Sequence, residues 1–244
     1  MNTVILARPS KTAKELSKSL DIPLYRHGEN VPYNTELVIR YGNTDRLNFD
    51  VTELNQREAI ITSSNKPLTR IALEAFGVPV PLETETDFPI IARTKHHEGG
   101  SGFYYCNDEY ELESAKEHDA VYFSKFYPKT AEYRVHIANN KTLLVSIKEG
   151  GNYASPIWNY KRTGFTLRHL YRHVWLEDED LLAIVKLAKK ALRILSLDFG
   201  AVDIMAFPKD NQPEAVISEV NTCPSLSPLA LSKYIDYLAS IIYE

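Results

Sequence analysis

Three oxygen-bearing side chains near the end of the chain have the types and spacing needed to bind a divalent cation. Asp203 lies inside one apolar run, and Glu219 and Asn221 follow a second one. Burying a carboxylate is costly unless it is paired or coordinates a cation. Residues two apart on a strand share a face, so Glu219 and Asn221 point the same way. Mg²⁺ favours such oxygen ligands and leaves its other positions to water and phosphates, so we expect a metal site that serves a nucleotide.

The alternative for these residues is structural: Asp203 would cap a turn, and Glu219 and Asn221 would face solvent at a strand end. One such residue alone would favour that interpretation. Three of them, in two adjacent apolar segments, favour metal binding.

A glycine-rich loop provides a second candidate feature. Gly99, Gly100, Ser101 and Gly102 lie between two predicted strands, and Arg93 ends the strand that enters the loop. Glycines let backbone N–H groups approach phosphate oxygens, and a fixed guanidinium beside them would add charge. Many hairpins use glycine only to turn, so the loop by itself is weak evidence for a phosphate site.

Three further charged residues have both a simple and a functional interpretation. Lys66 precedes a helix and, judged alone, is an exposed turn lysine. Glu132 and Arg134 share one face of a predicted strand, where they form either a same-strand ion pair of little energetic value or part of a phosphate site. In the second case Arg134 would neutralise charge on a transferred phosphoryl group.

The stretch from residue 158 to residue 172 is basic and aromatic, and it includes Lys161, Arg162 and Arg168. Such a pattern suits, in decreasing order, a pocket for an anionic small molecule, a surface loop, or single-stranded nucleic acid. The formal net charge of −4 argues against nucleic acid.

Bulk composition is that of an ordinary globular protein. The chain has 244 residues, of which 44% are hydrophobic and 25% charged, so it can bury a core as one large or several small domains. Two cysteines form no disulfide framework or zinc motif. No apolar run is long enough to cross a bilayer, and the N-terminus lacks a signal-peptide core. We therefore expect a cytoplasmic protein with no membrane partner.

The periodicity of the chain predicts alternating helices and strands. The first fifty residues read as a small βαβ-like unit with strands at Thr3–Ala7 and Glu36–Arg40 around a helix at Lys11–Leu20. The strongest helix pattern covers Asp180–Leu195. Further expected helices are Glu53–Ser63, Leu68–Phe76 and Leu229–Ile242, and further expected strands are Pro89–Arg93, Phe103–Cys106, Ala120–Tyr127, Arg134–Ala138 and Thr142–Ile147.

Taken in order, five segments resemble the ATP-grasp superfamily of carboxylate–amine ligases, in particular the glutamate ligases that modify ribosomal protein S6. They are NKPLTRIALEAFGVPVP, FPIIARTKHHEGGSGFYYC, VYFSKFYPKTAEYRVHI, LRILSLDFGAVDIMAF and AVISEVNTCPSLSP. Each segment is modest, but five in the right order are specific.

The resemblance implies an α+β, ATP-grasp fold, in which two lobes with antiparallel sheets grip ATP. Here a shortened unit over residues 1–54 would precede a first lobe at 55–127 and a second lobe at 128–244. The residues that match the family's ATP-binding positions are Lys66, Arg93, the loop that includes Gly99, Gly100, Ser101 and Gly102, the adenine-binding hinge Lys125, Phe126 and Tyr127, and Glu132; Arg134 matches the phosphoryl-stabilising position and Asp203, Glu219 and Asn221 the magnesium ligands.

The implied reaction joins a carboxylate to an amine. ATP would phosphorylate the carboxylate of a small molecule or peptide, and the amine would displace phosphate from the acylphosphate, with Mg²⁺ or Mn²⁺ as the cofactor. Two other outcomes remain open on the same scaffold, a phosphotransferase and a non-catalytic nucleotide-binding protein. The family usually carries a larger leading domain and a lysine where Arg93 stands, so the substrates cannot be transferred from relatives.

Overall fold

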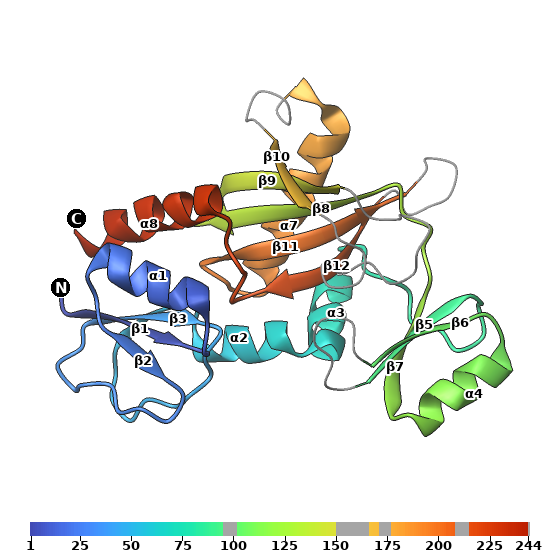
Figure 1. Cartoon of the computed structure of the whole chain (residues 1–244), viewed down its shortest axis with the longest axis horizontal. Coiled ribbons are helices and arrows are strands. Elements are labelled where there is room, and N and C mark those ends of the chain that lie inside the picture. Colours follow the sequence, from blue (N-terminus) through green and yellow to red (C-terminus); the bar gives the residue numbers. More distant parts are fainter. Residues whose placement is uncertain (95–101, 150–165, 171–176, 208–214, 244) are drawn as a thin grey trace.

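The computed structural model describes residues 1–94, 102–149, 166–170, 177–207 and 215–243, and it contains three sheets (Figure 1). A four-stranded sheet lies in the N-terminal unit, a five-stranded sheet occupies the middle, and a three-stranded sheet forms the opposite end. Both termini lie at the end formed by the N-terminal unit. Both later sheets are antiparallel, as the ATP-grasp resemblance predicts.

The N-terminal unit is a parallel sheet with the order β2-β1-β3-β4. Its central strands are fully buried, which suits a parallel sheet that is covered on both faces. The helix α1 begins after Ser10, whose side chain accepts a hydrogen bond from the backbone N–H of Ala13. The elements are β1 (Thr3–Ala7), α1 (Lys11–Leu20), β2 (Leu24–Arg26), β3 (Leu37–Tyr41) and β4 (Thr52–Leu54).

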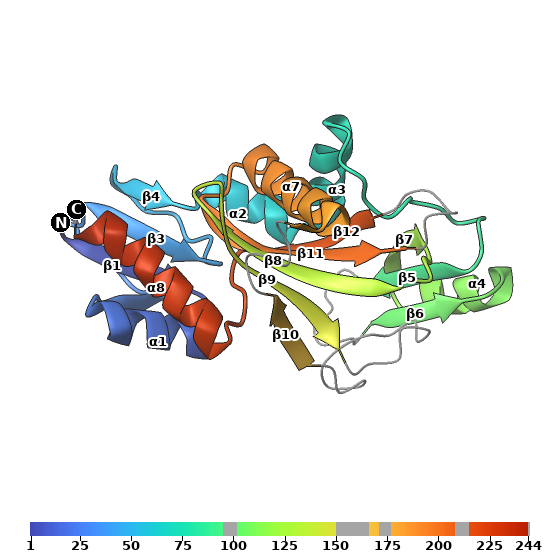
Figure 2. The ribbon, with the colours of Figure 1, turned by 90° about the horizontal axis from the view of Figure 1, so that it is seen from above.

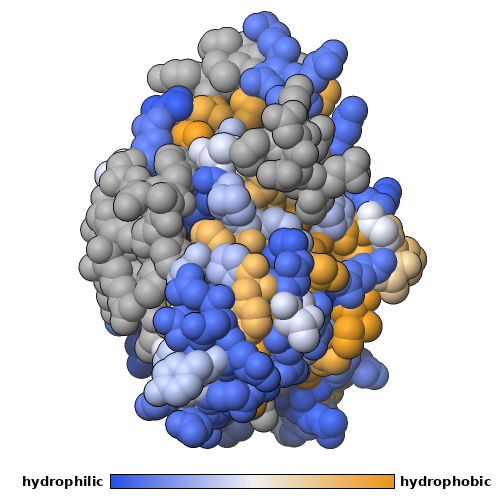
Figure 3. All heavy atoms as spheres, turned by 90° about the vertical axis from the view of Figure 1, so that its right-hand side faces the viewer, coloured by the Kyte–Doolittle hydropathy of each residue, from blue (hydrophilic) through white to orange (hydrophobic). Residues whose placement is uncertain are grey.

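The first antiparallel sheet is small, with the order β6-β5-β7, and one helix packs on it. This helix begins at an Asp108 cap and carries Glu109 and Glu111 in its first turn, where negative charge suits the helix dipole. Figure 3 shows that hydrophilic residues are prominent on this end of the molecule, with apolar residues interspersed among them. The elements are β5 (Ile90–Thr94), β6 (Phe103–Cys106), α4 (Glu109–Glu117) and β7 (Ala120–Lys125).

The five-stranded sheet has the order β10-β9-β8-β11-β12, and every neighbouring pair is antiparallel. One face carries an apolar core that is shared with α2, α3 and α7, which Figure 2 shows along one side of the sheet. The elements are α2 (Arg57–Ser64), α3 (Lys66–Ala75), β8 (Ala131–Ala138), β9 (Lys141–Glu149), β10 (Thr166–Leu170), α7 (Glu179–Ile194), β11 (Phe199–Ala206) and β12 (Ala215–Asn221).

Some helices pack against a sheet that belongs to another part of the chain. The last helix, α8 (Pro228–Ile242), packs beside α1 in the core of the N-terminal unit through Tyr234 and Leu238. Conversely, α2 and α3 belong to the core of the five-stranded sheet. The division at residues 54 and 127 stays a prediction, since helices from both sides of these positions share cores.

Three strands differ from the sequence expectation, and one of them, β2, was not expected at all. The expected helix over Glu53–Ser63 begins only at Arg57, because Thr52–Leu54 pairs with β3 and Asn55 then adopts a left-handed conformation with φ of 59°. Strand β10 was also not expected, because its pattern is irregular and its pairing with β9 is a tertiary interaction. Within the described residues, no helix is long and apolar enough to span a membrane.

Candidate active site

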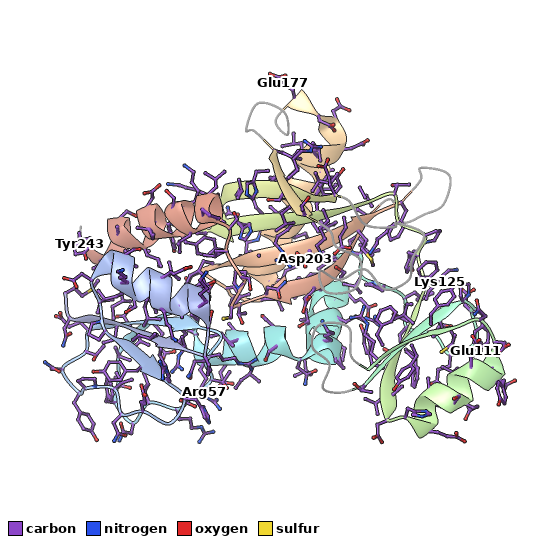
Figure 4. The ribbon with its side chains drawn as sticks, viewed as in Figure 1. Arg57, Glu111, Lys125, Glu177, Asp203 and Tyr243 are labelled. Carbon is purple, nitrogen blue, oxygen red and sulfur yellow. The ribbon has the colours of Figure 1, made fainter. Side chains whose placement is uncertain are left out.

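A continuous row of polar residues crosses the five-stranded sheet, with one residue from each strand. In the pairing registers, His169 lies opposite Ser146, Ser146 opposite Arg134, Arg134 opposite Asp203, and Asp203 opposite Glu219. Directly opposed residues share a face of a sheet, and the valines that alternate with them belong to the apolar core on the other face. The sheet therefore has one structural face and one polar face, and Asp203 lies near the middle of the molecule (Figure 4).

Arg134 and Asp203 form the centre of this row. The Nε and Nη2 atoms of Arg134 donate to the two carboxylate oxygens of Asp203, each at 2.7 Å. Burial alone would raise the pKa of Asp203, but the Arg134 and Lys148 charges outweigh it and hold that pKa well below its ordinary value. Burial likewise lowers the pKa of Arg134, and the Asp203 charge more than restores it. Asp203 is therefore ionised at neutral pH.

Two lysines join this network that sequence reasoning missed. Lys148 Nζ donates to Glu132 and lies 3.5 Å from Asp203 Oδ2, and Lys129 Nζ donates to Glu132 at 2.8 Å. Burial lowers the pKa of Lys129, which Glu132 only partly offsets. Burial also disfavours the charge on Lys148, but Asp203 and Glu132 raise its pKa overall. The signal for Lys148 was its two-residue spacing from Ser146, just beyond the predicted end of that strand.

The predicted metal ligands lie on the same polar face. Asp203 and Glu219 are directly opposed, and Asn221 follows Glu219 by two residues. Glu219 Oε1 accepts a hydrogen bond from Lys66 Nζ at 3.1 Å, and Nδ2 of Asn221 is buried with no hydrogen-bond partner among the described residues. The structure therefore brings the three residues to one face, with Lys66 arriving from helix α3.

This set fits Mg²⁺ by its donor chemistry. A carboxylate offers about four lone-pair positions, so Asp203 can accept from Arg134 and Lys148 and still ligate an ion. No group of three or more His, Cys, Asp or Glu that could hold a metal occurs in the described part of the chain. The predicted set contains only two carboxylates and one amide, so its metal role stays a prediction.

In the first lobe, Arg93 and Gly102 lie on the two sides of the glycine-rich loop in the sequence: Arg93 near the end of β5 and Gly102 directly before β6. Burial lowers the pKa of Arg93, and the Glu219 carboxylate partly offsets this. The Nε of Arg93 is buried with no hydrogen-bond partner in the described ranges, and its guanidinium lies 5.1 Å from the Phe103 ring centre. Gly102 has a φ of 60°, and a Cβ there would lie 2.0 Å from Thr94 Oγ1, so only glycine fits.

The expected adenine hinge is partly engaged within the chain. The backbone N–H of Lys125 donates to Leu82 and that of Phe126 donates to Pro89, at 2.8 and 2.9 Å. The Lys125 side chain contacts Asp87 at 2.5 Å and lies on the three-stranded lobe, away from Asp203 (Figure 4). The backbone N–H groups of Lys125 and Phe126 are therefore already bonded within the chain, and the Tyr127 hydroxyl accepts from the backbone N–H of Leu82. The adenine-hinge role of Lys125, Phe126 and Tyr127 stays a prediction.

Several predicted residues lie outside the described ranges: Gly99, Gly100 and Ser101 of the loop, and Lys161 and Arg162 of the basic stretch. Arg168 is described, and its Nε donates to Glu149 at 2.5 Å while more than half of its side chain is exposed. It lies next to His169 in β10, so its side chain points to the opposite face from the polar row.

The fold has well-defined relatives among solved structures. The structure of D-alanine–D-alanine ligase from Bacillus anthracis matches with a TM-score of 0.67 and 16% identity, over 98% of this chain and 92% of that one. The ATP-grasp ligase PsnB, complexed with a minimal precursor, matches with a TM-score of 0.69 and 11% identity over 98% and 99%. A RiPP-associated ATP-grasp ligase from Chryseobacterium gregarium, in complex with ADP and a leader and core peptide, gives 0.66 and 12% over 99% and 97%.

These matches establish that the chain has the ATP-grasp fold over nearly its full length. No family model and no curated protein sequence matches the chain. The narrower resemblance to the ribosomal protein S6 glutamate ligases stays a prediction.

Proposed function

We propose that this protein is an ATP-dependent carboxylate–amine ligase that forms an amide or peptide bond. The observation that carries the proposal is the Lys66–Glu219 contact beside the Arg134–Asp203 pair. The Lys66–Glu219 contact joins α3, the helix that precedes the three-stranded sheet, to the polar face of the five-stranded sheet. An ATP-grasp protein would hold the phosphates of ATP at this face.

Each charged group has a defined task in this reaction. Lys66 and Arg93 bind phosphate oxygens, and Arg134 stabilises charge on the transferred γ-phosphoryl group. Asp203, Glu219 and Asn221 would hold Mg²⁺, or Mn²⁺ in its place, which when bound neutralises the phosphate charge and fixes its orientation. PsnB has been captured with Mg and ADP, which supports the choice of ion.

The protein supplies little covalent chemistry in this mechanism. The residues position a substrate carboxylate for attack on the γ-phosphorus, which gives an acylphosphate and ADP. An amine then attacks the acyl carbon and phosphate leaves. Orientation and electrostatic stabilisation account for the rate, and a buried network of paired charges such as Arg134–Asp203 provides both.

We propose a peptide or amino acid as one of the two substrates. Two structural neighbours are complexed with precursor or core peptides, and a third is named for joining D-alanine units. Arg168, with Lys161 and Arg162 of the same basic stretch, would bind an additional anionic group on that substrate. Because Arg168 lies on the edge strand β10 and points away from the polar row, this group would have to extend around that edge of the sheet.

The test is a turnover assay with Mg²⁺, ATP and pools of amino acids and short peptides. We expect ADP release that depends on a pool and a new amide product detected by mass spectrometry. The Asp203→Ala variant should bind nucleotide weakly and form no product. A phosphorylated substrate as the end product would instead identify a phosphotransferase. ATP binding without any turnover would identify a non-catalytic nucleotide-binding protein.

A further inference from the structure

Two buried arginines of this chain have opposite environments. Arg40, in the N-terminal unit, is 1% exposed and all its guanidinium nitrogens are bonded, two of them to Glu53. Arg70, on α3, is 4% exposed, and none of its three guanidinium nitrogens has a hydrogen-bond partner within the described residues. Burying an unsatisfied charge is costly, so the environment of Arg70 requires an explanation beyond folding.

The contacts that Arg70 does make do not replace the missing hydrogen bonds. Its guanidinium stacks on the ring of Tyr122 at 4.4 Å, and Nη1 lies 3.7 Å from a carboxylate oxygen of Glu83. A cation–π contact satisfies no N–H donor, and the Glu83 side chain is 73% exposed. Both contacts leave the hydrogen-bonding capacity of the guanidinium unused.

Other cations lie around the same point. Lys66 is four residues before Arg70 on α3, so the two share one helix face. Arg93 is the strand partner of Tyr122, the residue on which Arg70 stacks. The Arg70 charge contributes to lowering the pKa of Arg93, after the larger effect of burial. Because like charges repel, an anion that contacts both guanidiniums would stabilise this pair.

We infer that Arg70 is a third phosphate-binding cation, which together with Lys66 and Arg93 binds the polyphosphate tail of the nucleotide. A guanidinium presents its donors in a planar fork that matches phosphate oxygens. Glu83 contacts the guanidinium from the surface and is the anion that phosphate would displace. The identity of the ligand as a nucleotide rests on the proposed function, whereas the anion site itself rests on the geometry of Arg70.

The test compares Arg70→Met, Arg70→Lys and wild type in calorimetric titrations with ATP, ADP and tripolyphosphate. Charged hydrogen bonds of this type correspond to about a 10- to 100-fold change in affinity. We expect Arg70→Met to lower the affinity for all three ligands by about this factor, and Arg70→Lys to lower it less. Glu83→Gln should tighten binding, because it removes the competing carboxylate. Lys190→Met, which removes a cation that contacts the backbone oxygen of Phe76 at the end of α3, should leave affinities unchanged.

Stability without ligand separates this role from a packing role. If the role of Arg70 is to bind an anion, Arg70→Met should melt at the same temperature as wild type or higher in the absence of ligand. The variant should also lose most of the rise in melting temperature that the ligand gives wild type. Lower stability with unchanged ATP affinity would overturn the inference and make Arg70 a packing residue on Tyr122. If wild type binds tripolyphosphate through Arg70 but does not bind ATP, the anion site stands and the proposed ligase function fails.

Discussion

The guanidinium of Arg134 binds both carboxylate oxygens of Asp203 through two parallel contacts of 2.7 Å. The two residues lie opposite each other on β8 and β11, so the backbone pairing fixes their geometry before any ligand arrives. Such a two-point contact holds both side chains in one orientation. The pair therefore serves folding and, in the proposed reaction, holds a cation and a metal ligand ready beside each other.

Replacing Asp203 with Asn should reduce both stability and activity. The substitution keeps the shape but leaves Arg134 and Lys148 without the carboxylate charge that both contact. Breaking a buried pair by removing one partner typically costs about 3–5 kcal/mol. We expect a loss of this order in urea denaturation, together with loss of ligase activity at temperatures where the variant is folded.

The control for this variant is Glu113→Gln, which removes one carboxylate from an exposed pair with Lys116. Exposed pairs contribute about 0–1 kcal/mol, so this change should have little effect. Equal losses in the two variants would contradict the central position given to Asp203.

The candidate site was predictable where a polar residue interrupts an apolar strand. Asp203, Glu219 and Arg134 could be found in this way, because the apolar residues next to them in the sequence predict a buried strand. Lys148 carried only the weaker signal of its spacing from Ser146. Its contact with Glu132 could not be predicted, because only the pairing of β8 and β9 brings the two residues together. The same holds for Arg70, which reads as an ordinary helix residue until the fold buries it against Tyr122.

Glu132 and Lys148 should show strong coupling in a double-mutant cycle. Each is buried, and Lys148 Nζ donates to the carboxylate of Glu132. Glu132→Gln and Lys148→Met should each destabilise the protein by leaving a charge without its partner, and the double variant should lose less than the sum. An interaction term of about 1–3 kcal/mol in denaturant unfolding is expected. Additive losses would show that the two residues do not depend on each other.

Gly42→Ala should destabilise the contact between the N-terminal unit and the chain beyond β12. Gly42 has a φ of 71°, and an added Cβ would lie 2.6 Å from Cβ of Cys223, two residues after Asn221. We expect a loss of about 1–3 kcal/mol from strain and overpacking. Gly28→Ala is the control, since its φ is 79° but nothing lies within 4 Å of the added atom. A similar loss in both variants would mean that only backbone conformation matters.

Arg168→Gln tests whether the basic stretch binds an anionic group of the substrate. Arg168 is partly exposed and contacts only Glu149 by an ion pair in the described structure, so the fold does not depend on it. We expect KM for the anionic substrate to rise about tenfold or more, with KM for ATP nearly unchanged. Lys186→Gln, on the exposed face of α7, should change neither constant. An unchanged substrate KM in Arg168→Gln would remove this residue from the site.

His136 should make the protein acid-sensitive. It is 2% exposed, stacks edge-on against Tyr234, and burial followed by the nearby Arg134 charge lowers its pKa to about 3. The unfolded chain protonates this residue below about pH 6.5, whereas the folded chain does not until about pH 3. The unfolded state therefore binds more protons in this window, and stability falls as the pH falls.

The measurement is urea denaturation of wild type and His136→Gln between about pH 6.5 and about pH 4.5, where carboxylates contribute little. Over this range the free energy of unfolding of wild type should fall by about 2 kcal/mol more than that of the variant, from the linkage relation for a single site. Asp203 and His169, which also act on His136 electrostatically, are present in both proteins and cancel in the difference. His118→Gln, at the exposed end of α4, should keep the wild-type slope. Identical slopes for wild type and His136→Gln would mean that the folded protein protonates His136 as readily as the unfolded chain does, so that its burial carries no electrostatic cost.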